Sequence, residues 1–107
     1  MKVGIVGLGR MGAAITRRLL SGGHNCIVFD IDKTLIAEVV ADGAQETTDL
    51  ETLAGSFEDD TRIIWLMVPA SAVKSVLDEL VPYLSPGDVV IDGGNTNWLD
   101  DLDRASA

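Results

Sequence analysis

Gly7-Leu8-Gly9-Arg10-Met11-Gly12 is the stretch of sequence that decides the fold of this chain. It follows a short apolar segment, residues 2–6, whose β-branched side chains are typical of a buried strand. Apolar residues then recur at helical spacing from 11 to 19, and the pattern ends at Ser21-Gly22-Gly23. A glycine-rich turn between a strand and a helix is the context in which the spacing G-x-G-x-x-G binds a dinucleotide.

Each glycine of this stretch has a predicted role. Gly7 permits a tight turn, and Gly9 lets the backbone approach a pyrophosphate without a Cβ in the way. Gly12 lets the helix pack close to the strand. The free N–H groups of the first helical turn then face the phosphates, and the helix dipole adds to the attraction. We therefore expect all six residues of the stretch to bind a cofactor, the other interpretation being a glycine-rich turn without a ligand.

Asp30 ends the second apolar run of the chain. An acid at this place accepts hydrogen bonds from the hydroxyls of the adenosine ribose, and its charge repels a 2′-phosphate. The sequence therefore favours NAD over NADP as the cofactor, although Arg10 or Lys33 could reach a phosphate. The other interpretation of Asp30 is the start of a solvated loop, as for Asp32.

Strand and helix patterns alternate along the chain. Strands are expected at 2–6, 26–29, 45–47, 63–68 and 88–91, and helices at 11–19, 33–41, 50–54, 71–80 and 96–105. This order predicts an α/β fold, a Rossmann-type doubly wound parallel sheet between helices in three αβα layers. Residues 1–107 are expected to form one NAD(P)-binding domain.

Two more segments are expected at the carboxyl edge of that sheet, where such folds bind ligands. Met67, Val68, Pro69 and Ala70 leave the fourth strand and are predicted to pass the cofactor, although Met67 could equally fill the core. Asp92-Gly93-Gly94-Asn95 leaves the fifth strand. Asn95 offers a donor and an acceptor and is predicted to contact the ligand, or to cap the final helix.

Composition excludes several classes of function. The chain has 107 residues, 17 acidic and 8 basic side chains and a net charge of -9, so a nucleic-acid-binding face is not expected. No apolar run approaches the ~20 residues of a membrane span, and no membrane partner is expected. Cys26 is the only cysteine and no signal peptide is recognised, which favours the cytoplasm. His24 is the only histidine, and no spacing of ligands predicts a metal site.

The chain resembles the 6-phosphogluconate dehydrogenases, in a short bacterial form that prefers NAD. The resemblance is carried by Gly7-Leu8-Gly9-Arg10-Met11-Gly12, Arg17-Arg18-Leu19, Gly23-His24, Trp65-Leu66-Met67-Val68-Pro69-Ala70 and Ile91-Asp92-Gly93-Gly94-Asn95. It implies oxidative decarboxylation of 6-phosphogluconate to ribulose 5-phosphate in the pentose phosphate pathway, with hydride transfer to NAD(P). It also implies that Asn95 touches both cofactor and substrate. Family members that use NADP carry Asn-Arg-Thr where this chain has Asp30-Ile31-Asp32.

The resemblance also implies that the catalytic residues lie outside this chain. The family's catalytic Lys, its Ser-Gly-Gly and its Lys-x-x-His-Asn segment would follow Ala107, together with a helical domain that forms the dimer. We therefore expect an N-terminal part of a longer enzyme, inactive alone, that self-associates as a homo-oligomer. The alternatives are another β-hydroxyacid dehydrogenase, of the 3-hydroxyisobutyrate type, and a non-catalytic nucleotide-sensing module.

Overall fold

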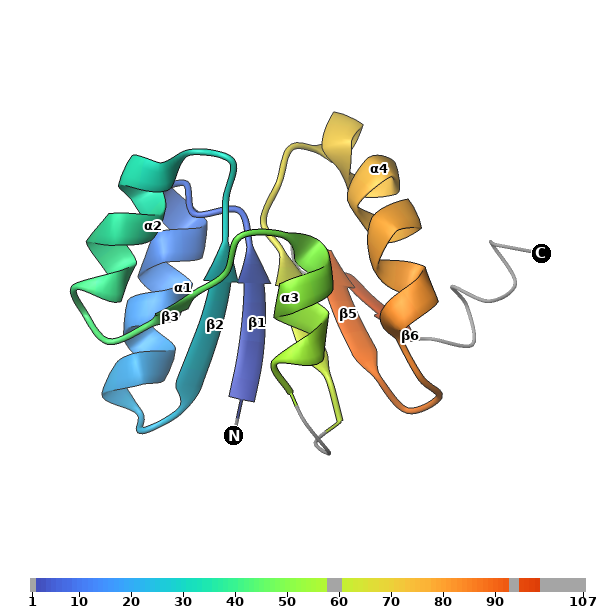
Figure 1. Cartoon of the computed structure of the whole chain (residues 1–107), viewed down its shortest axis with the longest axis horizontal. Coiled ribbons are helices and arrows are strands. Elements are labelled where there is room, and N and C mark those ends of the chain that lie inside the picture. The colour runs from blue at the N-terminus through green and yellow to red at the C-terminus, as the bar shows by residue number, and fades with distance from the viewer. Residues whose placement is uncertain (1, 58–60, 93–94, 99–107) are drawn as a thin grey trace.

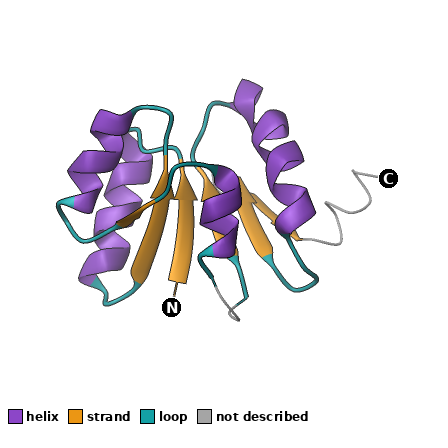
Figure 2. Cartoon of the chain, in the orientation of Figure 1, coloured by secondary structure: helices purple, strands orange, loops and turns teal. Residues whose placement is uncertain are grey.

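A six-stranded sheet runs through the centre of the molecule, with helices on both of its faces (Figures 1 and 2). The computed structural model describes residues 2–57, 61–92 and 95–98. The spatial order of the strands is β3-β2-β1-β4-β5-β6. Their bounds are β1 Lys2–Val6, β2 Asn25–Phe29, β3 Gln45–Glu46, β4 Ile63–Leu66, β5 Val89–Asp92 and β6 Asn95–Trp98.

The first five strands are parallel, which confirms the predicted doubly wound fold. The helices that follow them are α1 Arg10–Ser21, α2 Lys33–Val40, α3 Leu50–Gly55 and α4 Ala70–Leu80, with a 3-10 turn, η1 Val81–Tyr83, after α4. β1 lies at the centre, between β2 and β4. Because the strand order reverses there, the segments that leave β1 and β4 diverge at the carboxyl edge of the sheet. That edge is at the top of Figure 1, where the chain enters α1 and α2.

Alternate side chains of the central strands point to opposite faces of the sheet, where they pack into two hydrophobic cores. Ile5 of β1 and Val28 of β2 pack with α1 and α2, and both are fully buried. Val6 and Ile27, their neighbours in the chain, pack on the other face with α3 and α4, where Phe57 is also fully buried. β1 and β2 are buried on both faces, as their continuous apolar runs indicate. None of the described helices is long and apolar enough to cross a bilayer.

The predicted helix from residue 96 to 105 is wrong at its start. Residues Asn95–Trp98 form β6, which pairs antiparallel with β5 from Asp92↔Asn95 to Val89↔Trp98. The two strands are joined by two residues, both glycine, and a glycine pair is a common sequence for a tight hairpin connection. Gly93, Gly94 and the remainder of the predicted helix, 99–105, lie outside the described residues.

Asp88, a residue expected to begin the fifth strand, stabilises the amino edge of the sheet through hydrogen bonds. Its side chain is 4% exposed and lies just before β5. One carboxylate oxygen accepts from the Arg62 backbone N–H at 2.9 Å. The other accepts from the Arg62 guanidinium at 3.1 Å and from the Ser85 N–H at 2.8 Å. Asp88 thus joins the start of β4 to the turn before β5, on the edge opposite the glycine-rich stretch.

Candidate functional site

The glycine-rich turn leaves β1 and folds back against the end of β2. Gly7 has a φ of 97°, a backbone conformation that L side chains rarely adopt. Its N–H donates to the Phe29 carbonyl at 2.9 Å, which continues the β1–β2 pairing into the turn. Leu8 is 1% exposed and anchors the turn in the core. A Cβ on Gly7 would lie 2.6 Å from the Met67 carbonyl oxygen, so the backbone after β4 also fixes this turn.

Gly9 and Gly12 face very different surroundings. Gly12 is buried at the start of α1, and a Cβ there would collide with the Gly7 carbonyl oxygen. A Cβ on Gly9 would meet no atom within 4 Å. Gly12 is therefore needed for the packing of α1 on the turn, whereas the space above Gly9 is open to a ligand. An open backbone turn of this kind is what a bound pyrophosphate requires.

The amino end of α1 carries no negative charge of its own. Its first turn has no acidic residue, and Gly9 at the N-cap has no side chain to bond the free N–H groups. Those N–H groups and the positive end of the helix dipole favour a bound anion. Arg10 and Met11 are exposed in this turn, with Met11 64% exposed. The arrangement suits the phosphates of a dinucleotide.

The carboxylate of Asp30 lies against the glycine-rich turn. Its Oδ2 accepts from the Leu8 backbone N–H at 2.6 Å, and its Oδ1 accepts from the Asp32 N–H at 2.8 Å. Asp32 has a separate task, because its Oδ1 accepts from the Thr34 N–H at 2.9 Å and caps α2. Asp30 and Asp32, which are two residues apart in the sequence, therefore have different partners. Only Asp30 bonds the glycine-rich turn.

The segment from Met67 to Ala70 runs beside this turn, as expected. The Met67 N–H donates to the Val6 carbonyl at 2.7 Å, so β4 stays joined to β1 one residue beyond its end. Pro69 is the N-cap of α4, and Ala70 begins that helix. Met67 and Val68 are half-buried, and both pack against the cores. The structure thus brings this segment, the glycine-rich turn and Asp30 to one edge.

A cavity of about 560 Å³ opens between these segments. Its lining residues are Val6, Gly7, Gly9, Phe29, Asp30, Ile31, Leu35, Met67, Val68, Pro69, Ala72 and Val76. Most of these side chains are apolar, with Asp30 supplying the charge, which suits a flat apolar ring joined to a polar sugar. The lining residues that were not predicted as site residues are Val6, Phe29, Ile31, Leu35, Ala72 and Val76. Ile31 is 92% exposed. A large apolar side chain next to Asp30 is the feature of the sequence that could have indicated its place in the site.

One further predicted site residue, Asn95, lies near the carboxyl end of β5, whereas His24 and Cys26 lie elsewhere. Asn95 begins β6, and its backbone pairs with Asp92 at the end of β5. His24 lies in the turn between α1 and β2. Cys26 is buried in β2, and burial raises the pKa of its thiol. Within residues 2–57, 61–92 and 95–98, no group of three His, Cys, Asp or Glu side chains could hold a metal ion.

A doubly wound sheet with a glycine-rich turn and an acid at its switch point defines the Rossmann class of dinucleotide-binding domains. Comparison with known families agrees with this class. The sequence model of the NAD binding domain of 6-phosphogluconate dehydrogenase matches residues 2–107. The chain belongs to this family.

Curated relatives match all or most of the chain. The NAD(+)-dependent, decarboxylating 6-phosphogluconate dehydrogenase of Haloferax volcanii is 42% identical over 108 residues, which is 100% of this chain and 36% of that protein. The decarboxylating 6-phosphogluconate dehydrogenase of Bacillus licheniformis is 33% identical over 102 residues, 92% of this chain and 22% of that protein. The chain therefore spans about a third or less of the length of these relatives.

Solved structures share the fold. The 3-hydroxyisobutyrate dehydrogenase of Mycobacterium tuberculosis matches with a TM-score of 0.74 at 22% identity, over 85% of this chain and 30% of that one. The arogenate dehydrogenase of Synechocystis matches with a TM-score of 0.68 at 30% identity, over 86% of this chain and 32% of that one. These likenesses confirm the Rossmann-like architecture of the chain.

Proposed function

We propose that this chain is the cofactor-binding part of an oxidoreductase that oxidatively decarboxylates 6-phosphogluconate to ribulose 5-phosphate. The family match and the names of the curated relatives support this reaction. When bound, NAD(P) would supply the hydride acceptor. The proton-transfer groups and most of the substrate pocket are proposed to belong to the longer protein, which is proposed to be a homo-oligomer.

The observation that carries the proposal is the position of the Asp30 carboxylate beside the glycine-rich turn. The first-turn N–H groups of α1 would bind the pyrophosphate, and Asp30 would accept from the hydroxyls of the adenosine ribose. The adenine would lie in the apolar cavity between Ile31 and Val76. Because Asp30 is negatively charged, NAD is proposed to bind more tightly than NADP.

Two further segments are proposed to complete the cofactor site. The backbone and side chains of 67–70 would line the dinucleotide between the pyrophosphate and the nicotinamide, since they follow β4 at the switch point. Asn95, which follows β5 after two residues, would contact the cofactor and the sugar acid. The resemblance to the family supports this role for Asn95.

Separate titrations of NADH and NADPH, followed by tryptophan fluorescence, test the cofactor site. We expect NADH to bind more tightly, and Asp30→Ala to weaken NADH by about tenfold. Glu38→Ala, which removes an exposed carboxylate of α2, is the matched control and is expected to change neither affinity. Thermal melts by circular dichroism show whether each variant is folded. Folded wild-type chain that binds neither nucleotide would contradict the proposal.

The reaction itself is tested on the full-length parent protein. We expect it to reduce NAD with 6-phosphogluconate and to release carbon dioxide, and not to accept 3-hydroxyisobutyrate. The isolated 107-residue chain is expected to bind NADH without oxidising 6-phosphogluconate. Turnover by the isolated chain would contradict the assignment of proton transfer to the longer protein.

A further inference from the structure

One face of the sheet is only partly covered by helices. On this face α1 and α2 lie over β1, β2 and β3, whereas α3 and α4 pack on the opposite face. Figure 1 shows α1 and α2 beside β2 and β3, away from β5. Parallel sheets occur almost only with helices on both faces. In the described part of the chain, the half of this face that β4 and β5 form therefore lacks a full layer of helices.

Apolar side chains of β4 and β5 make up this uncovered area, which we call the open face. Its members are Ile63, Trp65, Val89 and Ile91. The register of β4 and β5 pairs them two by two, so they form adjacent rows on one face of the sheet. Ile64 and Val90, which alternate with them, are fully buried on the opposite face. The four side chains of the open face are only half-buried, so the same two strands are sealed on one face and accessible on the other.

The open face is too small to hold a second copy of the chain tightly. Four half-buried side chains offer only a small part of the ~800 Å² that each partner of a stable interface buries. The net charge of -9 on each copy also opposes association. A segment of the same polypeptide needs less area, because the connection between them gives it a high effective concentration. Size and charge therefore favour a tethered segment as the occupant.

The course of the chain brings such a segment to the right place. β6 runs antiparallel to β5, and its last residue, Trp98, is paired with Val89 at the start of β5. The backbone thus returns to the amino edge of the sheet, next to the open face. The chain spans about a third or less of the length of its curated relatives, so a longer protein has ample chain to cover this face.

We propose that a helix of the longer protein, located after residue 107, packs on the open face and completes the layer of helices. This inference rests on the proposed longer protein and concerns a surface outside the candidate site. The helix would direct an apolar stripe toward Trp65 and polar side chains toward water. Met67, two residues after Trp65, packs on the same face and lines the cofactor cavity. The helix would therefore adjoin the cofactor site at one end.

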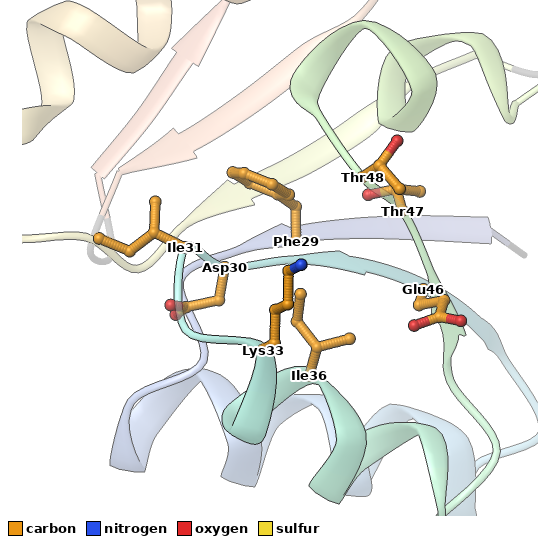
Figure 3. Close-up of a pocket in the computed structure, with 8 residues that line it drawn as sticks. All are labelled: Phe29, Asp30, Ile31, Lys33, Ile36, Glu46, Thr47 and Thr48. Carbon is orange, nitrogen blue, oxygen red and sulfur yellow. The ribbon is translucent and has the colours of Figure 1, made fainter.

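Thiol labelling of Val89→Cys, in the full-length parent protein and in the isolated chain, tests this inference. Peptide mass spectrometry reads the label at residue 89 alone, so other cysteines do not interfere. Val89 lines neither the cofactor cavity nor the cavity next to it, whose side chains are drawn in Figure 3. We expect labelling to be about tenfold slower, or more, in the parent than in the isolated chain. Glu38→Cys, on the exposed side of α2, is the matched control and should label equally fast in both.

The dependence on protein concentration identifies the occupant. Protection of residue 89 in the parent that persists on dilution supports the tethered helix. Protection that disappears on dilution would assign the open face to a second copy and overturn the inference. Equal labelling rates in the parent and the isolated chain would overturn it as well, and so would protection that the dilute isolated chain already shows. Circular dichroism melts verify that each variant is folded.

Failure of the proposed function gives a different result. A parent protein that protects residue 89 but does not oxidise 6-phosphogluconate would leave this inference intact and contradict the reaction. An active parent protein with an accessible residue 89 would leave the reaction intact and contradict the helix.

Discussion

Gly9 and Gly12 allow ligand binding to be separated from folding by two substitutions of the same kind. Gly9→Ala places a methyl group in open space, and the φ of −64° and ψ of −169° at Gly9 are accessible to alanine. We expect the free energy of unfolding to fall by about 1 kcal/mol, since alanine is a poorer N-cap than glycine, while NADH affinity falls about tenfold or more. Gly12→Ala forces a methyl group onto the Gly7 carbonyl, so we expect a loss of about 3 kcal/mol or a failure to fold.

Urea unfolding of the two variants, with NADH titrations on whichever of them is folded, checks this contrast. Wild-type NADH affinity in folded Gly9→Ala would mean that no phosphate group approaches the backbone there. A Gly12→Ala chain as stable as wild type would mean that α1 can shift away from the turn at little cost.

Cys26 gives a residue-scale prediction about reactivity. Burial raises the pKa of its thiol, and its Sγ donates to the Thr16 carbonyl at 3.7 Å. We expect a thiol reagent to label native protein slowly and urea-unfolded protein quickly, because the reagent needs an accessible thiolate. The folded state also holds the thiol proton more tightly. Folding stability should therefore fall as pH rises from the ordinary thiol pKa toward the raised value, and Cys26→Ala should lack that fall. Equal labelling rates in native and unfolded protein would contradict the prediction.

At the scale of elements, the contact between Arg62 and Asp88 is expected to hold β4 and β5 together at the amino edge. Arg62→Ala leaves a carboxylate that is 4% exposed without its charged partner. We expect the free energy of unfolding to fall by about 3 kcal/mol. NADH affinity should be unchanged in the folded protein, since this edge is opposite the candidate site.

Urea unfolding of Arg62→Ala, Asp88→Asn and the double variant measures this contribution. The double variant should be destabilised by less than the sum of the two single changes, because both remove the same contact. An additive result would show that the two side chains stabilise the sheet independently of each other.

Sequence patterns predict the elements whose determinants are local. The β-branched run before Gly7 and the helical spacing after it predicted β1 and α1, and short apolar runs predicted β2, β4 and β5. β3 has the polar sequence Gln45-Glu46, and no apolar run marks it. The pattern could not place β6, since the glycine pair before Asn95 suits a hairpin as well as a ligand loop and Thr96 suits a strand as well as a helix. The fourth strand was predicted to span 63–68. In the structure β4 ends at Leu66, because the chain then turns toward α4.

The candidate site was predictable only in part for the same reason. Gly7, Gly12 and Asp30 belong to a motif with fixed spacing, so their positions at one edge follow from the sequence. Ala72 and Val76 line the cavity because α4 packs at a particular angle over the sheet, and no local pattern distinguishes them from core residues. The bonds of Asp30 to the Leu8 and Asp32 N–H groups likewise depend on the tertiary arrangement.

At the scale of the whole molecule, half-buried apolar side chains on the sheet lead us to expect self-association. β4 carries Ile63 and Trp65 on the face that α1 and α2 cover, yet both side chains are only half-buried. We expect sedimentation velocity to show dimers that become more populated as concentration rises. The net charge of -9 opposes association, so added salt should favour the dimer by screening that charge. A chain that stays monomeric at its highest soluble concentration, with or without salt, would contradict this prediction.

The two hydrogen bonds accepted by Asp30 constrain how cofactor choice can be altered by directed evolution. Both of its oxygens face backbone N–H donors. An asparagine offers one oxygen and one NH₂ group, so Asp30→Asn sets a donor against either Leu8 or Asp32. Reversal of specificity at this position therefore carries a structural cost, because both donors are backbone N–H groups that other side chains leave in place. Proline at residue 32 is the substitution that removes one of these donors. Libraries that vary residues 30 and 32 together should therefore yield NADP-selective chains that stepwise libraries miss.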